Sequence, residues 1–360
     1  MIGPIVCDIE GLELTPAERK RLLNPLVGMV ILFTRNYESR EQLHRLCDAI
    51  HAVKPGLLIG VDHEGGRVQR FREAFTAIPA MHAYGDLYAK DAARALKALK
   101  AATFVLAAEL RDCGVDFTFA PVLDLDWQKS AIIGERSFAS DPEAVATLAR
   151  AACEGLAQAG MANCGKHFPG HGFAAADSHV TLPVDERSAD EILAKDAKPY
   201  RALTDILTSV MTAHVLYPAL DAVPASFSHT IATDILRGKV GFNGLLFSDD
   251  LSMGGAKTEG TILERAQKAL AAGCDALIVC NDPDATEELL SKLTWKKSPL
   301  FATRALRLVP VAGPWKFGNL RDNCAYRHCR ECMTDGLSVH SPLFSEKNND
   351  YRIATGYGPI

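Results

Sequence analysis

Leu57-Leu58-Ile59-Gly60-Val61-Asp62 is the stretch that decides the fold, because an unbroken apolar run ends there in an acidic residue. Continuous apolar runs of this length are typical of strands that are buried on both faces, as in parallel sheets. Seven more runs of this kind recur along the chain, and amphipathic stretches separate most of them. The eight runs cover residues 2–7, 27–33, 57–62, 117–122, 163–168, 210–215, 245–249 and 276–280.

Signals for helix starts lie between these runs. Thr15-Pro16-Ala17-Glu18 combines a capping threonine, a proline at the first helical position and a glutamate three residues after the cap. The same cap spacing recurs at 39–42, 140–143 and 188–191, Asp282-Pro283 opens another helix, and 91–113 is a long alanine-rich helical stretch.

Strand runs that alternate with helices predict an α/β fold, a single domain with a TIM-type (β/α)8 barrel. The alternative is an open doubly wound sheet, but no G-x-G-x-x-G fingerprint follows the first run. We expect the catalytic barrel to span residues 1–309. Residues 310–360 are rich in glycine, proline, asparagine, arginine and cysteine, so we expect an irregular C-terminal extension there.

Composition narrows the class of protein. The 360 residues are 48% hydrophobic and 23% charged, with a net charge of -5, which is typical of a globular protein with a large core. This balance does not indicate nucleic acid or a membrane surface as partner. The N-terminus has no secretory pattern, and no apolar run is long enough to cross a bilayer. We therefore expect a cytoplasmic monomer whose partner is a small-molecule substrate.

The cysteines fall into two groups. Cys324, Cys329 and Cys332 form a C-x4-C-x2-C pattern with His328 beside them. Iron–sulfur ligation needs a further cysteine downstream, and zinc ligation is strained by two adjacent ligands, so we interpret the three as surface thiols without a role. The other seven lie singly in apolar segments and are expected to be reduced and buried: Cys7, Cys47, Cys113, Cys153, Cys164, Cys274 and Cys280.

Polar residues lie at the C-terminal ends of four of the strand runs. In a barrel the carboxyl ends of all strands open onto one face, where active sites form, so these side chains would converge in one pocket. Polar residues at one strand end could merely cap the sheet, but four such ends favour an enzyme. They are Asp62, Lys166-His167, His214 and Asp249-Asp250.

A glycine-rich segment, residues 165–173, follows the fifth run and leads to Asp177-Ser178-His179. Three glycines and a proline shape a loop that can move as a unit. A carboxylate beside an imidazole fixes the tautomer of the imidazole and raises its basicity. Asp177 and His179 therefore form a pair that is suited to delivering and removing protons.

Four motifs occur together and in order: Asp62-His63-Glu64-Gly65-Gly66-Arg67-Val68-Gln69-Arg70, Gly134-Glu135-Arg136-Ser137-Phe138, Lys166-His167-Phe168-Pro169-Gly170-His171-Gly172 with Asp177-Ser178-His179, and Ser248-Asp249-Asp250-Leu251-Ser252-Met253. Over residues 2–290 the chain closely resembles the bacterial β-N-acetylglucosaminidases of glycoside hydrolase family 3 that act in cell-wall recycling. Two local departures are Gly254-Gly255, where an acid or a small residue is common, and Thr212, where proline is expected.

The resemblance implies a role for each matching position. Asp249 matches the nucleophile of the family, and His179, oriented by Asp177, matches its general acid/base. The implied activity is removal of terminal β-linked N-acetylglucosamine from muropeptides, through a covalent glycosyl-aspartate intermediate. The resemblance implies no metal and no organic cofactor. The implied sugar-binding positions are Asp62, Arg70, Arg136, Lys166 and His167.

Several alternatives for single residues stay open. Asp250 could be the nucleophile, although adjacent side chains at a strand end point to opposite sides and the resemblance favours Asp249. His63 and Glu64 are interpreted as structural, and His214 as either a sugar contact or a satisfied core histidine. A zinc site could also be built from the histidines of the glycine-rich loop with Asp62 or Asp249, but their spacing does not match helical zinc ligation.

Three other functions compete with the glycosidase. A phosphorylase of the same family would pass the sugar to phosphate, which a histidine acid/base repels less than a carboxylate does. A metal-dependent hydrolase would use the histidine loop. A non-catalytic muropeptide sensor would keep the scaffold without turnover.

Overall fold

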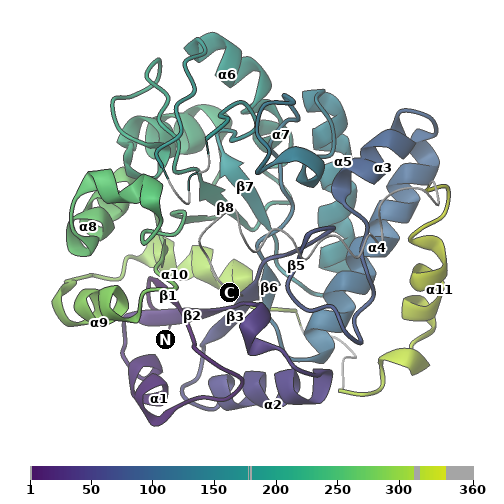
Figure 1. Cartoon of the computed structure of the whole chain (residues 1–360), viewed down its shortest axis with the longest axis horizontal. Coiled ribbons are helices and arrows are strands. Elements are labelled where there is room, and N and C mark those ends of the chain that lie inside the picture. The colour runs from purple at the N-terminus through teal and green to yellow at the C-terminus, as the bar shows by residue number, and fades with distance from the viewer. Residues whose placement is uncertain (1, 177, 179–180, 312–316, 338–360) are drawn as a thin grey trace.

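Parallel strands and helices alternate along the chain, as the sequence predicted (Figure 1). The computed structural model describes residues 2–176, 178, 181–311 and 317–337. Within them the parallel strands are β1 (Ile5–Asp8), β2 (Val27–Leu32), β3 (Leu58–Val61), β6 (Phe117–Thr118), β7 (Cys164–Phe168), β8 (Ser209–Thr212), β9 (Leu245–Phe247) and β10 (Leu277–Ile278). An antiparallel hairpin, β4 (His63–Gly65) and β5 (Val68–Gln69), follows β3.

The prediction of a closed (β/α)8 barrel is wrong. The strands form two separate parallel sheets, one in the order β10-β1-β2-β3-β6 and the other in the order β7-β8-β9. Between these sheets the pairing is reduced to isolated bridges, Phe117 to Ala162, Val122 to Lys166 and Phe247 to Ala276. One cause lies in the sequence, because Pro121 has no N–H to donate and β6 ends three residues before it.

The helices largely begin where the sequence signals predicted. Thr15, Ser39, Ser188 and Asp282 each cap the helix that follows. The fifth helix differs by one residue, because its cap is Asp141 and not Ser140. The α-helices of the described residues are α1 (Pro16–Leu22), α2 (Arg40–His51), α3 (Met81–Tyr88), α4 (Ala92–Asp112), α5 (Pro142–Gln158), α6 (Ala189–Lys195), α7 (Lys198–Ala202), α8 (Ile262–Ala272), α9 (Pro283–Lys292), α10 (Pro299–Ala305) and α11 (Cys324–Cys332), and η4 (Thr230–Val240) is a π-helix.

The C-terminal region is more regular than predicted. Within residues 317–337, α11 forms a regular helix that packs along α4 at the edge of the molecule (Figure 1). Asn323 caps it by accepting a hydrogen bond from the backbone N–H of Tyr326. Residues 312–316 and 338–360 lie outside the described residues. The division of the chain at residue 309 therefore stays a prediction.

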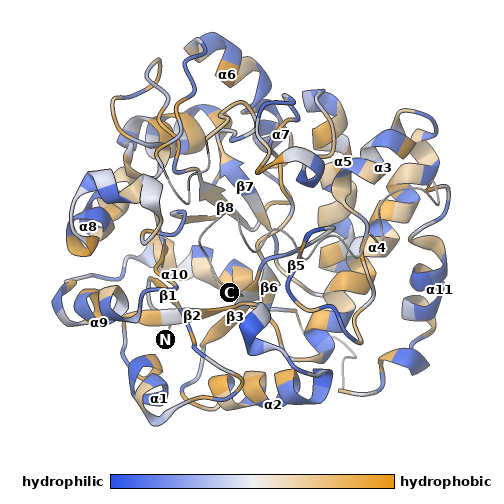
Figure 2. Ribbon diagram, in the orientation of Figure 1, coloured by the Kyte–Doolittle hydropathy of each residue, from blue (hydrophilic) through white to orange (hydrophobic). Residues whose placement is uncertain are grey.

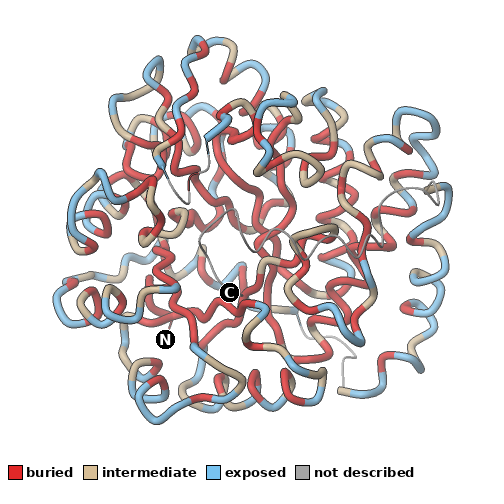
Figure 3. Tube along the Cα trace, viewed as in Figure 1, coloured by how far each residue is buried: buried red, intermediate tan, exposed pale blue. Residues whose placement is uncertain are grey.

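Two apolar cores hold the elements together. The inner core takes side chains from all eight parallel strands, among them Val6, Met29, Phe117 and Phe247, and α10 packs against it through Phe301. The outer core lies between the strands and the surrounding helices. Strands and the facing sides of α4 and α5 are mostly apolar (Figure 2), and the buried trace runs through the centre of the molecule (Figure 3).

Burial confirms what the sequence predicted for the cysteines. The seven cysteines predicted to be buried are all buried and free, whereas Cys324 is exposed and Cys329 and Cys332 are partly exposed. Among the described residues, no helix is both long enough and apolar enough to pass through a bilayer.

Candidate active site

The hairpin after β3 brings four of the five predicted sugar-binding residues together. Asp62 follows β3, Arg70 follows β5, Arg136 ends the short 3-10 helix η2 (Gly134–Arg136), and Lys166 lies in β7. Lys166 Nζ is 2.6 Å from Asp62 Oδ1, and Arg70 Nη2 is 3.6 Å from Asp62 Oδ2. Segments more than a hundred residues apart therefore meet at one carboxylate.

Glu64 is the centre of this cluster. Its carboxylate accepts two hydrogen bonds from Arg136, from Nε and from Nη2, each at 2.8 Å, and its Oε1 lies 2.7 Å from Lys166 Nζ. A bidentate pair of this kind fixes the plane of the guanidinium group. The sequence analysis interpreted Glu64 as structural, and its contacts agree: it orients two cations that are predicted to bind sugar.

The charges in the cluster stabilise one another. Burial alone would raise the pKa of Asp62, but the charges of Lys166 and Arg70 outweigh burial and lower it. The pKa of Glu64 is likewise held well below its usual range by Arg136 and Lys166 against the effect of burial. The carboxylates in turn raise the pKa of Lys166 and of Arg136 despite burial. All four groups are therefore charged near neutral pH.

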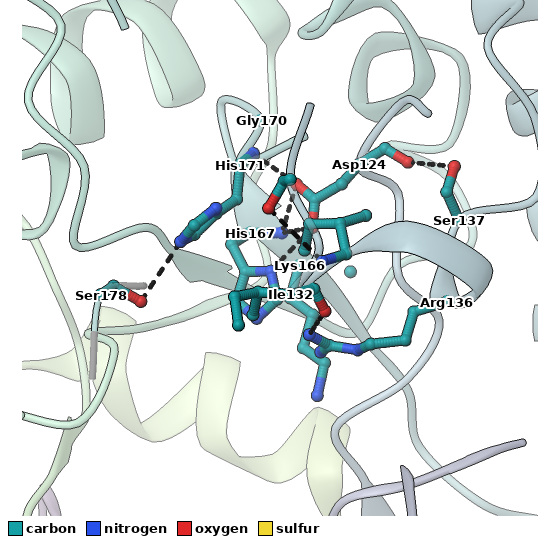
Figure 4. Close-up of polar contacts among 12 residues, drawn as sticks. Asp124, Ile132, Arg136, Ser137, Lys166, His167, Gly170, His171 and Ser178 are labelled. Atoms are coloured by element: carbon teal, nitrogen blue, oxygen red, sulfur yellow. Dashed lines mark hydrogen bonds and ion pairs between the residues drawn. The ribbon is translucent and has the colours of Figure 1, made fainter. Parts of the chain in front are cut away.

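His167, the fifth predicted sugar-binding residue, is held by an acid that the sequence analysis missed. Asp124 is buried, with 1% of its surface exposed, and its Oδ2 is 2.8 Å from His167 Nδ1 (Figure 4). Its Oδ1 also accepts a hydrogen bond from the backbone N–H of His171 at 2.7 Å. Asp124 lies just after the fourth strand run, so the rule that identified the other strand ends would have found it.

The predicted nucleophile lies after β9, at the tip of the second sheet. Asp249 Oδ1 accepts a hydrogen bond from the backbone N–H of Asp250 at 2.9 Å, and the backbone N–H of Asp249 donates to Ser226 Oγ at 3.4 Å. Its charge acts on the pKa of both His171 and His214, where it opposes the lowering that burial causes. Asp249 is therefore within electrostatic reach of the His167–His171 loop.

The neighbouring acid has a different environment. Asp250 turns its carboxylate to Ser252 Oγ, at 2.6 Å, and to Cys280 Sγ, at 3.1 Å. Burial raises the pKa of Asp250 to about 6, although these hydrogen bonds oppose the change. Its backbone carbonyl lies 2.9 Å from His214 Nε2. Asp250 thus makes the structural hydrogen bonds expected of it, and His214 is a buried histidine that braces the same turn.

Asp177 and His179, the predicted proton-transfer pair, lie outside the described residues. The residue between them, Ser178, is described and buried. Its Oγ is 3.2 Å from His171 Nε2 (Figure 4), and its carbonyl accepts a hydrogen bond from the backbone N–H of Gly255 at 2.9 Å. Ser178 is therefore held by two loops of the second sheet, one after β7 and one after β9.

The two local departures from the family pattern both make contacts in this region. A Cβ on Gly255 would lie 3.0 Å from the carbonyl oxygen of Ser178 and 3.2 Å from that of Thr181, so glycine permits the close approach. Thr212 Oγ1 lies 2.8 Å from Ser226 Oγ and 3.2 Å from the carbonyl oxygen of Phe247. Its hydroxyl therefore ties β8 to β9 directly behind Asp249.

Metal binding was one of the alternatives for this loop and for the C-terminal cysteines. Among the described residues, no three histidine, cysteine or acidic side chains are grouped so that they could hold a metal ion. On α11, His328 Nε2 lies 3.7 Å from Cys332 Sγ, which makes a pair only. His179, which the zinc hypothesis included, is not among the described residues, so metal dependence is left to experiment.

Charged side chains gathered at the carboxyl ends of parallel strands are typical of the active site of an α/β enzyme. Comparison with known proteins gives the family. Residues 7–308 match the family described as "Glycosyl hydrolase family 3 N terminal domain", and the chain belongs to glycoside hydrolase family 3. The resemblance inferred from the four motifs is thereby confirmed.

Relatives in this family are similar over nearly their whole length. A β-hexosaminidase of Bordetella avium is 51% identical over 339 residues, which cover 93% of this chain and 96% of the relative. Native NagZ from Neisseria gonorrhoeae superimposes with a TM-score of 0.88 at 45% identity, covering 94% of this chain and 98% of that one. The same Neisseria protein has been solved with N-trifluoroacetyl-D-glucosamine, with a TM-score of 0.87, 45% identity and coverage of 92% and 97%.

Proposed function

We propose that this chain is a retaining exo-β-N-acetylglucosaminidase. It removes terminal β-linked N-acetylglucosamine from peptidoglycan fragments during cell-wall recycling, as a monomer in the cytoplasm. The observation that carries the proposal is the network of ion pairs that joins Arg70 to Asp62, and Asp62 through Lys166 to Glu64 and Arg136. Its near full-length similarity to β-hexosaminidases supports the choice of sugar.

Retaining glycosidases commonly place two carboxyl groups about 5 Å apart on either side of the glycosidic bond. Here Asp249 is the proposed nucleophile, and His179 takes the place of the second carboxyl group. Asp249 attacks the anomeric carbon while His179 protonates the departing oxygen, so one C–O bond forms as the other breaks. His179 then removes a proton from water, and that water releases the sugar from Asp249. Acid–base help of this kind contributes about 100- to 10,000-fold in rate.

The charged cluster supplies the binding half of the proposal. Asp62 accepts hydrogen bonds from sugar hydroxyls, and the cations around it donate them. Because Glu64 already holds Arg136 and Lys166, their donors are oriented before the sugar arrives, which lowers the entropic cost of binding. His167, oriented by Asp124, presents its second ring nitrogen to the same sugar.

Replacement of the nucleophile is the first test. Asp249→Asn is expected to abolish release of nitrophenol from a nitrophenyl N-acetyl-β-glucosaminide, because the amide cannot form the covalent intermediate. A fluorinated or 2-acetamido mechanism-based sugar is expected to label the peptide that spans residues 247–253. Wild-type turnover in Asp249→Asn, or a label that maps elsewhere, would remove the nucleophile assignment.

Two substrates of different reactivity are needed to test the proton-transfer role of His179. His179→Ala is expected to slow cleavage of substrates with poor leaving groups far more than cleavage of nitrophenyl substrates, because good leaving groups need no protonation. The ratio of the two kcat/KM losses is the measurement. Equal losses on both substrates would argue against a proton donor at His179.

Product analysis separates the competing functions. With and without phosphate, a hydrolase releases free N-acetylglucosamine, whereas a phosphorylase would release the sugar 1-phosphate when phosphate is present. Activity that survives exhaustive chelation would eliminate the metal-dependent hydrolase, and any turnover at all would eliminate the non-catalytic sensor.

A further inference from the structure

The C-terminal helix α11 inserts one polar side chain deep into the molecule. Tyr326 is 4% exposed, and its hydroxyl donates a hydrogen bond to Glu109 Oε1 on α4 at 2.5 Å. Glu109 is 3% exposed, so this contact is shielded from water. Burial, followed by the charge of Glu109, raises the pKa of Tyr326 to about 12, so the phenol keeps its proton and acts as a donor.

Glu109 does not serve α11 alone. Its Oε1 also accepts a hydrogen bond from Thr76 Oγ1 at 2.6 Å, and its Oε2 accepts one from the Thr76 backbone N–H at 2.8 Å. Thr76 belongs to the segment that follows β5. One buried carboxylate therefore joins three parts of the chain that are far apart in sequence: the hairpin segment, α4 and α11.

Thr76 in turn closes a loop around a predicted sugar-binding residue. Gln69, which ends β5, donates from Nε2 to the carbonyl of Thr76 at 3.0 Å and to that of Phe71 at 3.1 Å. Its Oε1 accepts a hydrogen bond from the backbone N–H of Ile78 at 3.0 Å. Arg70 lies between Gln69 and Phe71, so its backbone is fixed by this ring of contacts while its side chain reaches Asp62.

We propose that Tyr326 is a positioning residue for the active site: through Glu109 and Thr76 it fixes residues 69–78 and so places Arg70 against Asp62. This inference rests on the proposed function in one respect, which is that Arg70 and Asp62 bind the sugar. It gives the C-terminal segment a role in substrate binding, although α11 touches none of the predicted catalytic or sugar-binding residues in the contacts of the described chain.

The Tyr326 hydroxyl donates a hydrogen bond to the buried carboxylate of Glu109. Without it, Glu109 Oε1 keeps only Thr76 Oγ1 as a side-chain donor, and a buried carboxylate that lacks a donor is costly. The carboxylate can recover by shifting toward the remaining donors or toward water. Either shift moves Thr76, and with it the segment that carries Arg70.

The test compares two tyrosines that both tie the C-terminal segment to the body of the protein. Tyr326→Phe removes the donor to Glu109. Tyr84→Phe is the matched control, because the buried Tyr84 hydroxyl on α3 donates to the carbonyl of Met333, just after α11, at 3.1 Å, and makes no hydrogen bond to Glu109 in the described part of the chain. Both changes delete one buried hydroxyl and keep the aromatic ring.

In the full chain, Tyr326→Phe is expected to raise KM for the nitrophenyl N-acetyl-β-glucosaminide about three- to tenfold, with kcat changed less than twofold. Tyr84→Phe is expected to leave KM unchanged. Thr76→Val is expected to raise KM as well, and the double variant with Tyr326→Phe should show less than the product of the two effects. An unchanged KM in Tyr326→Phe, or an equal rise in Tyr84→Phe, overturns the proposal.

Hydrogen exchange provides a readout that does not depend on activity. The backbone N–H of Thr76 donates to Glu109 and that of Ile78 donates to Gln69, so both should exchange faster in Tyr326→Phe than in the wild type and stay unchanged in Tyr84→Phe. If the wild-type protein does not cleave the sugar, the proposed function fails, and exchange at Thr76 alone decides the link to α11. Acceleration there supports the link, and its absence overturns it.

Discussion

The buried acids of this protein differ in pKa according to whether a cation lies beside them. Asp62 and Glu64 face Lys166 and arginines, and their pKa values fall below the ordinary range. Among the described residues, Asp250 accepts hydrogen bonds from neutral groups alone, and burial raises its pKa to about 6. The same residue type is thus stabilised as a charge at one strand end and destabilised as a charge at another.

The environment of Asp250 predicts a pH dependence of stability. Its pKa is higher in the folded protein than the usual 3.8, so folding binds a proton at this group, and the contribution of Asp250 to stability should rise as the pH falls from 7.5 through about 6 toward 4. In Asp250→Asn this gain should be absent, a difference on the order of 1–3 kcal/mol between pH 7.5 and 5. The measurement is the free energy of urea unfolding at both pH values.

A surface acid provides the control for this prediction. Glu186→Gln removes a carboxylate from an exposed position and should follow the wild-type pH dependence. If Asp250→Asn also kept the wild-type pH dependence, the prediction that the pKa of Asp250 is raised in the folded protein would be wrong.

At the scale of single residues, sequence reasoning found the charges but not all of their partners. Asp62, Arg70, Arg136 and Lys166 meet in the structure as a shared site requires. Asp124 was missed although it also follows a strand run, since the motif search gave it no role. Which partner a charge selects depends on side-chain direction in three dimensions, and one sequence without its fold does not contain that information.

At the scale of elements, two loops of the second sheet converge on Ser178. His171 comes from the loop after β7, and Gly255 is the second residue of a short 3-10 helix, Gly254–Glu259, after β9. The sequence analysis named Gly254-Gly255 as a departure from the family pattern and gave it no role. Its consequence is a close approach between backbones that a side chain at residue 255 would obstruct.

The anchoring of Ser178 predicts a selective kinetic effect. Ser178→Ala removes the hydroxyl that meets His171, and the neighbours of Ser178 in sequence are the proposed proton-transfer pair. We expect kcat to fall about three- to tenfold, the equivalent of one hydrogen bond, with KM little changed. The measurement is kcat on a substrate with a poor leaving group, where proton transfer limits the rate.

A buried serine away from the site serves as the comparison. Ser209 Oγ donates to the carbonyl of Asn163 at 2.7 Å at the start of β8, and Ser209→Ala should leave kcat unchanged. Equal losses in the two serine variants would mean that general destabilisation, and not anchoring of the loop, is responsible.

Helix starts were the most predictable elements, because a cap is a local contact. Thr15 and Glu18 satisfy each other within one turn, so four residues of sequence suffice to identify the motif. The helix α11 was not predicted. Its residues are mostly polar, and Tyr326 is the one residue of the helix that is buried, so the segment has too little apolar surface to stand out in the sequence.

At the scale of the whole molecule, aromatic packing joins the two sheets. Phe119 lies 5.0 Å from Phe117 of the first sheet and 5.3 Å from Phe247 of the second, measured between ring centroids. Only isolated bridges connect the strands there, so side-chain packing replaces a continuous hydrogen-bond ladder. The apolar runs in the sequence located all eight parallel strands but could not predict this break, because pairing depends on where each short strand stops.

Loss of this packing should destabilise the whole fold. Phe119 is fully buried, and Phe119→Ala is expected to lower the free energy of unfolding by about 3–5 kcal/mol. Leu300→Ala, at a position 60% exposed, should change it by less than about 0.5 kcal/mol. Urea unfolding followed by tryptophan fluorescence measures both, and a loss below about 1 kcal/mol for Phe119→Ala would show that the sheets are held together elsewhere.

The cluster around Glu64 has a consequence for how the protein responds to its solution. Lys166 and Glu64 expose 3% and 2% of their side chains, so each finds its counter-ion inside the chain. Dissolved ions screen charges that face the solvent and reach such pairs poorly. The affinity of the site for a neutral sugar should therefore be nearly indifferent to ionic strength, and the same cluster can work in dilute buffer and in concentrated salt.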